Sequence, residues 1–232
     1  AKIEEGFQND LNNEIFLDSS EVLSNIKYQQ GDYGLDKFSI EIDYFEKNRS
    51  FELFGFKRSY MGNKNQYYLS TPQPQQQSYT LSLKSFDNDV KTGLTVGHFN
   101  TLSGFPDLET NGLFDNRITS LNYFLVKTLG SSSIGFEMDQ FLQRYKAIHH
   151  LSLYNNPRFL NRSLYKAELT SSINQIPILL GISINDRATI LDSRLHIGWV
   201  NFYSNLKWNH LNLFTSATKN ENRFLYDYSL IF

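Results

Sequence analysis

Apolar and polar residues alternate along most of this chain in segments of roughly ten residues. Between residues 38 and 44, aromatic and aliphatic residues occupy the even positions, whereas Ser39, Glu41 and Asp43 occupy the odd ones. Successive side chains of a β-strand point to opposite faces, so each such segment predicts a strand with one apolar and one polar face. The same alternation recurs at 51–56, 79–84, 91–97, 121–125, 134–139, 165–170, 178–184, 191–197 and 224–232, with an opening strand at 21–30.

The segment 202–215 also alternates, but its parity changes between Trp208 and Leu211. One extra residue in a strand produces such a change, so the pattern predicts a single strand with a β-bulge. Together these segments predict an all-β, antiparallel, up-and-down fold of about twelve strands. Aromatic residues make up 15% of the chain, which favours strands over helices.

The last ten residues alternate most clearly, because every second position from Phe224 to Phe232 is apolar. A final strand that ends in phenylalanine resembles the closing strand of Gram-negative outer-membrane β-barrels, which the barrel-insertion machinery recognises. The resemblance covers these ten residues and departs from the usual pattern at Leu225 and Asp227. It implies a bacterial outer-membrane location, with membrane lipid and the insertion machinery as partners. The implied insertion signal consists of Phe224, Tyr226, Tyr228, Leu230 and Phe232.

Connection lengths alternate as well. Tight turns are predicted at Glu46, Asp87, Gly130 and Asn174, whereas long polar connections are predicted at 61–77, 102–115 and 144–161. Outer-membrane barrels have short periplasmic turns and longer extracellular loops. With twelve strands both ends of the chain fall on the short-turn side, as that architecture requires. We therefore expect a closed transmembrane barrel over residues 21–232 and an N-terminal periplasmic segment over residues 1–20.

Composition excludes several other classes. No run of about 20 apolar residues occurs, and the mean hydropathy of −0.42 argues against membrane-spanning helices. A barrel escapes this argument because its lumen-facing residues lower the average. The net charge of −2 gives no electrostatic signature for nucleic acid, and the absence of cysteine excludes disulfides and thiolate metal sites.

A soluble β-sandwich or lipocalin-like barrel shows the same alternation with its apolar face turned inward. Three features favour an apolar exterior: full charges in the middle of the polar faces, the terminal Phe232, and aromatic residues near strand ends, where interfacial girdles lie. Backbone groups in hydrocarbon must be paired within the protein, so the segment 224–232 is expected to pair with 21–30 and close the barrel. The girdle candidates are Tyr44, Phe45, Tyr60, Tyr79, Tyr123, Tyr203 and Tyr226.

A porin-like channel for small solutes is the function that this interpretation favours. Charges of both signs argue against strong selectivity for anions or cations. The same charges are equally explained as ion pairs that hold the wall together. The candidate lumen-lining residues are Arg58, Lys84, Lys91, Glu137, Asp139, Lys166, Glu168, Asp192 and Arg194, with His196 expected to share the face of the last two.

Two alternatives remain: a structural or adhesive barrel that acts through its long loops, and a lipid-modifying barrel enzyme. Outer-membrane phospholipases place a histidine, a serine two residues later, and an asparagine from the next strand on the outer face. Here His98 is followed by Asn100 instead of serine, and the parity of Asn122 turns it to the opposite face. A nucleophile and its base must lie within hydrogen-bond reach, so we predict no catalytic residues, and likewise no metal or cofactor. The oligomeric state is left open.

Overall fold

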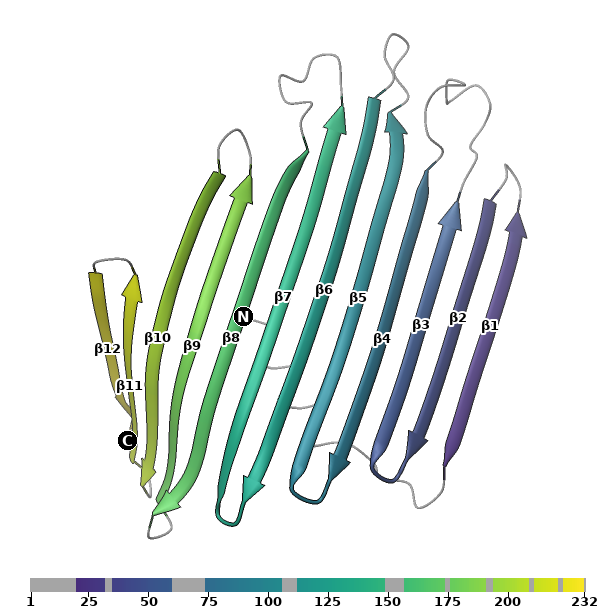
Figure 1. Cartoon of the computed structure of the whole chain (residues 1–232). Coiled ribbons are helices and arrows are strands. Elements are labelled where there is room, and N and C mark those ends of the chain that lie inside the picture. The colour runs from purple at the N-terminus through teal and green to yellow at the C-terminus, as the bar shows by residue number, and fades with distance from the viewer. Residues whose placement is uncertain are drawn as a thin grey trace.

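A computed structural model describes residues 20–31, 35–59, 74–105, 112–148, 157–173, 176–190, 194–208, 211–220 and 223–231. All of the assigned elements are strands, and they form one twelve-stranded antiparallel sheet in the order of the sequence (Figure 1). The predicted all-β up-and-down fold is confirmed. Within these ranges, no helix is long and apolar enough to cross a membrane. The strands are β1 (Glu21–Gly31), β2 (Leu35–Glu46), β3 (Arg49–Ser59), β4 (Gln75–Asp87), β5 (Val90–Phe105), β6 (Gly112–Leu129), β7 (Ser132–Ile148), β8 (Arg158–Ile173), β9 (Ile176–Ile190), β10 (Arg194–Trp208), β11 (Leu211–Asn220) and β12 (Arg223–Ile231).

The strand boundaries differ from prediction in the last third of the chain. Residues 194–197 and 202–208 belong to one strand, β10, and the predicted bulge is instead the connection between β10 and β11. Trp208 pairs with Leu211, so an even and an odd residue share a face across this connection. A bulge and a two-residue hairpin produce the same parity change in the sequence. Only the ladder of paired strands distinguishes them.

The connections at one edge of the sheet are short, as predicted. Two residues separate the strands at 47–48, 88–89, 130–131, 174–175 and 209–210. Gly130 has a φ of 62°, in the left-handed region that glycine adopts without a steric penalty and that two-residue hairpin turns require. At the other edge the strands continue beyond the predicted boundaries, because their polar ends still pair. The three predicted long connections there are shorter than expected and span 60–74, 106–111 and 149–157 between strands. The other three connections at this edge have two or three residues, at 32–34, 191–193 and 221–222.

From β2–β3 to β8–β9, successive short turns are displaced along the strands by two residues, whereas the turn of β10–β11 is level with that of β8–β9. The row of paired residues through Glu46 and Arg49, next to the first turn, reaches β4 at Ser85, two residues before that strand ends at Asp87. The same displacement recurs at the next two hairpins. Turn backbone contributes to it, since Phe86 N–H donates to the carbonyl of Asn48 at 2.8 Å. One residue of displacement per strand corresponds to a strand tilt of about 35°.

Pairing brings the apolar positions of all twelve strands onto one face. One unbroken row of directly paired residues crosses the sheet on this apolar face, and Lys219 is its only charged member. The ammonium of Lys219 lies 5.6 Å from the centre of the Phe224 ring. The row consists of Val22, Tyr44, Phe51, Leu83, Leu94, Tyr123, Met138, Tyr165, Ile184, Val200, Lys219 and Phe224.

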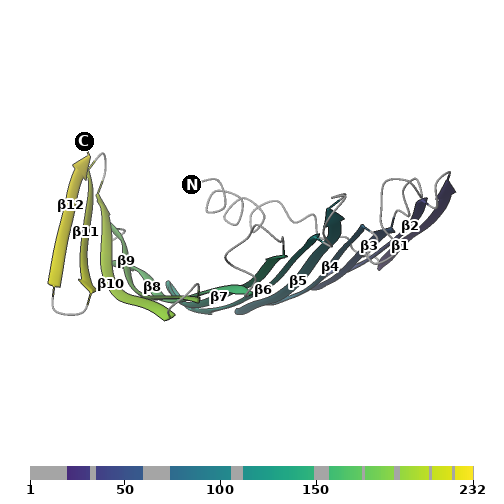
Figure 2. The same ribbon diagram turned by 90° about the horizontal axis from the view of Figure 1, so that it is seen from above.

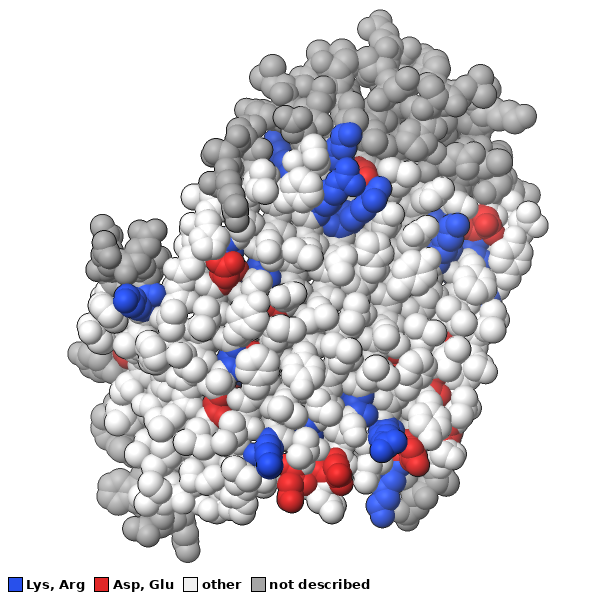
Figure 3. Space-filling model, viewed as in Figure 1, with Lys and Arg blue, Asp and Glu red and all other residues white. Residues whose placement is uncertain are grey.

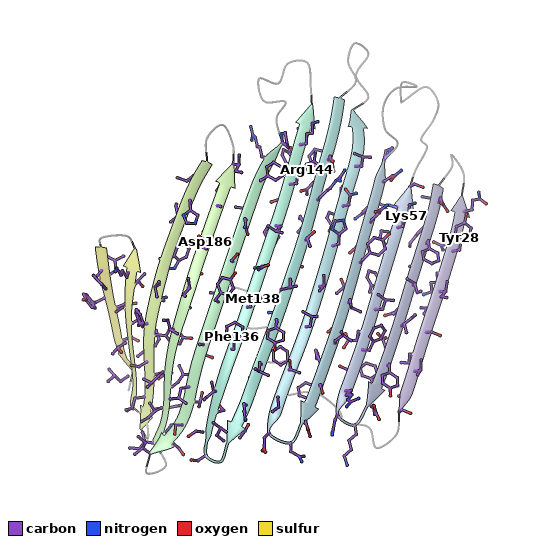
Figure 4. The ribbon with its side chains drawn as sticks, viewed as in Figure 1. Tyr28, Lys57, Phe136, Met138, Arg144 and Asp186 are labelled. Atoms are coloured by element: carbon purple, nitrogen blue, oxygen red, sulfur yellow. The ribbon has the colours of Figure 1, made fainter. Side chains whose placement is uncertain are left out.

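The sheet is curved, and the apolar face is its convex side. Figure 2 shows an open trough in which the edge strands β1 and β12 bend away from the side viewed in Figure 1. That viewed side carries Tyr28, Phe136 and Met138, which belong to the apolar face (Figure 4). Its surface is largely uncharged across the middle, with charged side chains toward both ends (Figure 3).

The sheet encloses no hydrophobic core. No hydrophobic residue in the described part of the chain is buried, and the accessible surface is 16591 Å². A compact protein of 27.0 kDa exposes roughly 11,000 Å². Most of the exposed large hydrophobic residues lie on the apolar face; the exceptions are Leu23, Phe54, Leu195, Ile197 and Leu225. The convex face is therefore a broad apolar surface.

The two edge strands do not pair with each other in this structure. Among the described residues β1 pairs with β2 alone and β12 with β11 alone. The expected ladder between 224–232 and 21–30 is absent, so the sheet is open. The predicted N-terminal segment lies outside the described residues up to residue 19.

Candidate functional site on the polar face

The concave, polar face collects most of the charges that the sequence placed in a lumen. The register puts them on the side of the sheet opposite the apolar row, in β3, β4, β5, β7 and β8. They come from strands far apart in sequence, so the ladder alone brings them onto one surface. These residues are Arg58, Lys84, Lys91, Glu137, Asp139, Lys166 and Glu168.

The other two candidates have different outcomes. Asp192 lies outside the described residues. Arg194 occupies a position directly paired with Ile190, which places it on the apolar face, and His196 shares that face by pairing with Ala188. The expectation that both faced inward is wrong. The short pattern at 191–197 indicates one face for these residues, but the full ladder between β10 and β9 places them on the other.

Three charged side chains form a network in the middle of the polar face. The Lys166 ammonium lies 3.0 Å from Glu168 Oε1 and 3.9 Å from Glu137 Oε2. Glu137 and Lys166 are directly paired across β7 and β8, and all three side chains are about 30% exposed. In such a partly wet site the pairs contribute little to stability. Their main effect is to fix where positive and negative charge lie on the wall.

Tyr203 extends this network from β10 to β8 across the intervening strand. Glu168, Gly181 and Tyr203 are directly paired in one row, and the Tyr203 hydroxyl donates to Glu168 Oε1 at 2.7 Å. A Cβ at position 181 would lie 2.2 Å from Tyr203 Cζ. The glycine therefore leaves the space in which the ring lies over β9. Tyr203 was expected in an interfacial girdle, but it belongs to the polar face.

A second glycine on the polar face accommodates a ring in the same way. A Cβ on Gly93 of β5 would lie 2.2 Å from Phe124 Cε1 of β6. Close by, Asn122 Nδ2 donates to Asp139 Oδ1 at 2.5 Å, which links β6 to β7. Aromatic rings that lie over glycines, and side chains that are hydrogen-bonded across strands, therefore cover this part of the polar face.

Charge is distributed unevenly around the polar face. Asp43 and Glu52 are directly paired acidic residues of β2 and β3, and Glu41 lies next to them. Arg162 and Arg187 are directly paired basic residues of β8 and β9. Each pair therefore concentrates one sign of charge on its part of the sheet, although like charges directly opposite each other are destabilising. Arg187 also lies 5.2 Å from the centre of the Trp199 ring.

The histidines form no catalytic or metal arrangement in the described part of the chain. His98 lies on the apolar face, where its Nδ1 is 3.0 Å from Thr119 Oγ1, whereas Asn122 is on the polar face, as predicted. His196 Nε2 lies 2.5 Å from Asp186 Oδ1. No group of three or more metal-ligating residues occurs among the residues that the structure describes.

The described members of the predicted insertion signal share the apolar face. Phe224 and Tyr226 are 54% and 73% exposed, and their rings stack with centroids 6.3 Å apart. Tyr228 and Leu230 occupy register positions on the same face. Phe232 lies outside the described residues.

Comparison with known proteins adds no family. No protein-family model matches this chain, and none of the curated proteins compared with it is similar in sequence. The two faces of the sheet are therefore the features that bear on function.

Proposed function

We propose that this chain forms a closed twelve-stranded barrel in a bacterial outer membrane and acts as a porin-like channel for small polar solutes. The observation that carries the proposal is the segregation of the two faces. An apolar row crosses all twelve strands on the convex side, while the charged network lies on the concave side.

The apolar face supports a lipid environment because no other described element covers it. Water disfavours such a surface by about 25 cal/mol per Å² of apolar area, so a sheet with this face and no core needs an apolar surrounding. Transmembrane β-strands need about 9–11 residues. The strands here contain between 9 residues in β12 and 18 in β6.

Closure follows from the same environment. Unpaired N–H and C=O groups on β1 and β12 cost several kcal/mol each in hydrocarbon, which favours pairing of the two edge strands. A barrel of twelve strands at the tilt given above has a backbone radius of about 11 Å. That interior is wider than a filled eight-stranded barrel and narrower than a large porin.

The charges of the polar face support a channel for solutes of low net charge. In a twelve-stranded barrel β2 and β3 lie opposite β8 and β9. Asp43 and Glu52 lie three residues from the short-turn ends of their strands, whereas Arg162 and Arg187 lie eleven residues from theirs, so the acidic and basic pairs would occupy opposite ends of the lumen on opposite walls. A small solute that carries both signs, or a polar neutral one, fits this field better than a strongly charged ion.

Conductance in planar bilayers tests the proposal. Protein refolded in detergent should show heat-modifiable gel mobility and insert as steps of constant conductance. A folded protein that inserts without current would contradict the channel and favour a structural or adhesive barrel.

Replacing a wall charge should change ion preference. Lys166→Gln removes the cation that lies beside Glu137 and Glu168, so the permeability of K⁺ relative to Cl⁻ should rise, by roughly two- to fivefold. The reversal potential in a KCl gradient measures this ratio. Lys127→Gln is the matched control, because Lys127 lies on the apolar face and should leave the ratio unchanged. Equal shifts in the two variants would contradict the assignment of the polar face to the lumen.

A further inference from the structure

A basic cluster lies on the apolar face at the end with the long connections. Arg117 of β6 and Arg144 of β7 are directly paired, and Lys146 is directly paired with Asp115 next to them. Figure 3 shows Lys and Arg side chains gathered at the upper end of this face, and Figure 4 places Arg144 at the upper end of β7. We call these residues, Asp115, Arg117, Arg144 and Lys146, the upper basic cluster.

The cluster has a surplus of positive charge. Asp115 is 5% exposed and holds Arg117 in a two-point ion pair, with Nε to Oδ1 at 3.0 Å and Nη2 to Oδ2 at 2.9 Å. Among the described residues no ion pair neutralises Arg144 or Lys146. Two guanidinium groups directly opposite each other repel unless an anion lies between them.

A hollow of about 460 Å³ opens beside the two arginines. Leu142, Phe159 and Ile190 line it on the apolar face, and their side chains are 48%, 40% and 43% exposed. The site therefore combines cations at its rim with an apolar lining. An amphiphile with a negative headgroup and hydrocarbon chains matches both parts.

The cluster lies where the apolar band ends. In β7 this face carries apolar residues from Ile134 to Leu142 except at Gln140, whose amide donates to the Tyr165 hydroxyl, and Arg144 follows directly. Eight residues at a tilt of about 35° span about 22 Å along the membrane normal, close to the ~25 Å apolar band of outer-membrane barrels. Arg144 would therefore lie at headgroup level on the side of the long connections, which is the extracellular side of such barrels.

We propose that the upper basic cluster binds a phosphate-bearing lipid of the outer leaflet, with the phosphate on Arg144, Lys146 and the free edge of Arg117 and the acyl chains against Leu142 and Phe159. This inference rests on the membrane barrel proposed above. Guanidinium groups bind phosphate oxygens in a two-point geometry, which makes arginine the preferred residue for such a headgroup.

Native mass spectrometry of the full chain, refolded in a neutral detergent, tests the site. The probe is lipid A, an acylated disaccharide with two phosphates. Arg144→Gln should lower its affinity roughly tenfold, because one charge-assisted contact is lost. Lys57→Gln is the control: Lys57 lies in the same row of paired residues and on the same face, three strands from Arg117 (Figure 4). Arg117 itself is left intact, since its loss would strand the buried Asp115 carboxylate.

Equal lipid A binding by the two variants would overturn the site. Displacement of lipid A by an equal concentration of inorganic phosphate would also overturn it, since the cluster would then bind a free anion without using its apolar lining. Heat-modifiable mobility is measured for every sample. If the two variants fold and bind lipid A equally, only the lipid site is refuted. If the protein without any substitution lacks both heat-modifiable mobility and conductance, the barrel itself is refuted.

Discussion

Single glycines decide which rings can cross a neighbouring strand on the polar face. Gly181 lies between Glu168 and Tyr203 in one row, and any side chain there would occupy the space of the Tyr203 ring. The ring covers β9 backbone and carries its hydroxyl to a carboxylate two strands away. The glycine thus costs some strand propensity but permits an aromatic contact and a hydrogen bond in return.

Gly181→Ala should lower the free energy of unfolding by about 1–3 kcal/mol, because the ring must move and the bond to Glu168 is lost. Urea unfolding in detergent, followed by tryptophan fluorescence, measures the change. Gly135→Ala is the matched control on the same face, since its nearest neighbour would be Val126 Cγ2 at an ordinary 3.8 Å. Equal stability of the two variants would show that the space above Gly181 is not needed.

The hairpins are the elements that set the geometry of the sheet. From β2–β3 to β8–β9, each hairpin extends two residues beyond the preceding one. Thr128 N–H donates to the main-chain carbonyl of Asp89 at 2.7 Å, which repeats the contact seen at the preceding turn. This displacement tilts the strands of these hairpins. A tilt produced by turns is a local property, and it is present in the open sheet.

Gly130 is the turn residue with the clearest conformational requirement. Gly130→Ala should destabilise the protein by about 1 kcal/mol, because alanine disfavours a φ of 62° although no atom would contact its Cβ. Gly130→Asn should cost less, since asparagine tolerates this conformation. Unfolding midpoints of the two variants give the comparison. An alanine variant as stable as the asparagine variant would contradict the argument.

At the scale of the whole molecule, the open sheet has two faces and no interior. Its stability cannot come from a buried core, because none exists among the described residues. The backbone ladder contributes to it, and the proposed membrane would supply an apolar surrounding for the convex face. Closure of β12 on β1 would remove both edges and turn the concave face into a lumen.

Cysteine pairs test closure and measure the shear of the barrel. The chain has no cysteine, so a fixed Ser229→Cys can be combined with cysteine at Leu23, Asn25, Lys27 or Gln29 of β1, all on the polar face. One row of directly paired residues begins at Val22 of β1 and ends at Phe224 of β12. In a closed barrel with a shear of about twelve residues, this row returns to β1 about twelve residues beyond Val22. Antiparallel pairing then places Ser229 opposite Gln29. We expect this pair to give an intramolecular disulfide.

The cysteine scan has two controls. Ile26→Cys lies on the opposite face of β1 and should not react with Ser229→Cys. If none of the four pairs reacts within one chain, β1 and β12 do not close the sheet. Disulfides that form only between chains would instead place the closure between copies.

Much of the fold was predictable because strand periodicity is local. Alternation at 38–44 or 79–84 identifies a strand and its two faces without knowledge of any partner. The prediction was wrong where the alternation of a short segment is ambiguous. The parity change between Trp208 and Leu211 fits a bulge as well as a hairpin, and the few residues around Arg194 do not determine its face. The ladder between β10 and β11 identified the hairpin, and the ladder between β9 and β10 determined the face of Arg194.

The polar network was likewise predictable from the sequence only in part. The sequence placed Glu137, Lys166 and Glu168 on one kind of face, but nothing in it links Gly181 to Tyr203, since that contact depends on the register of three strands. Alternation by itself determined the strands, their two faces and the edge at which the short turns lie. Only the tertiary structure decided which residues are neighbours across strands and that the apolar face is convex, because register and curvature arise from pairing between strands and not from any one of them.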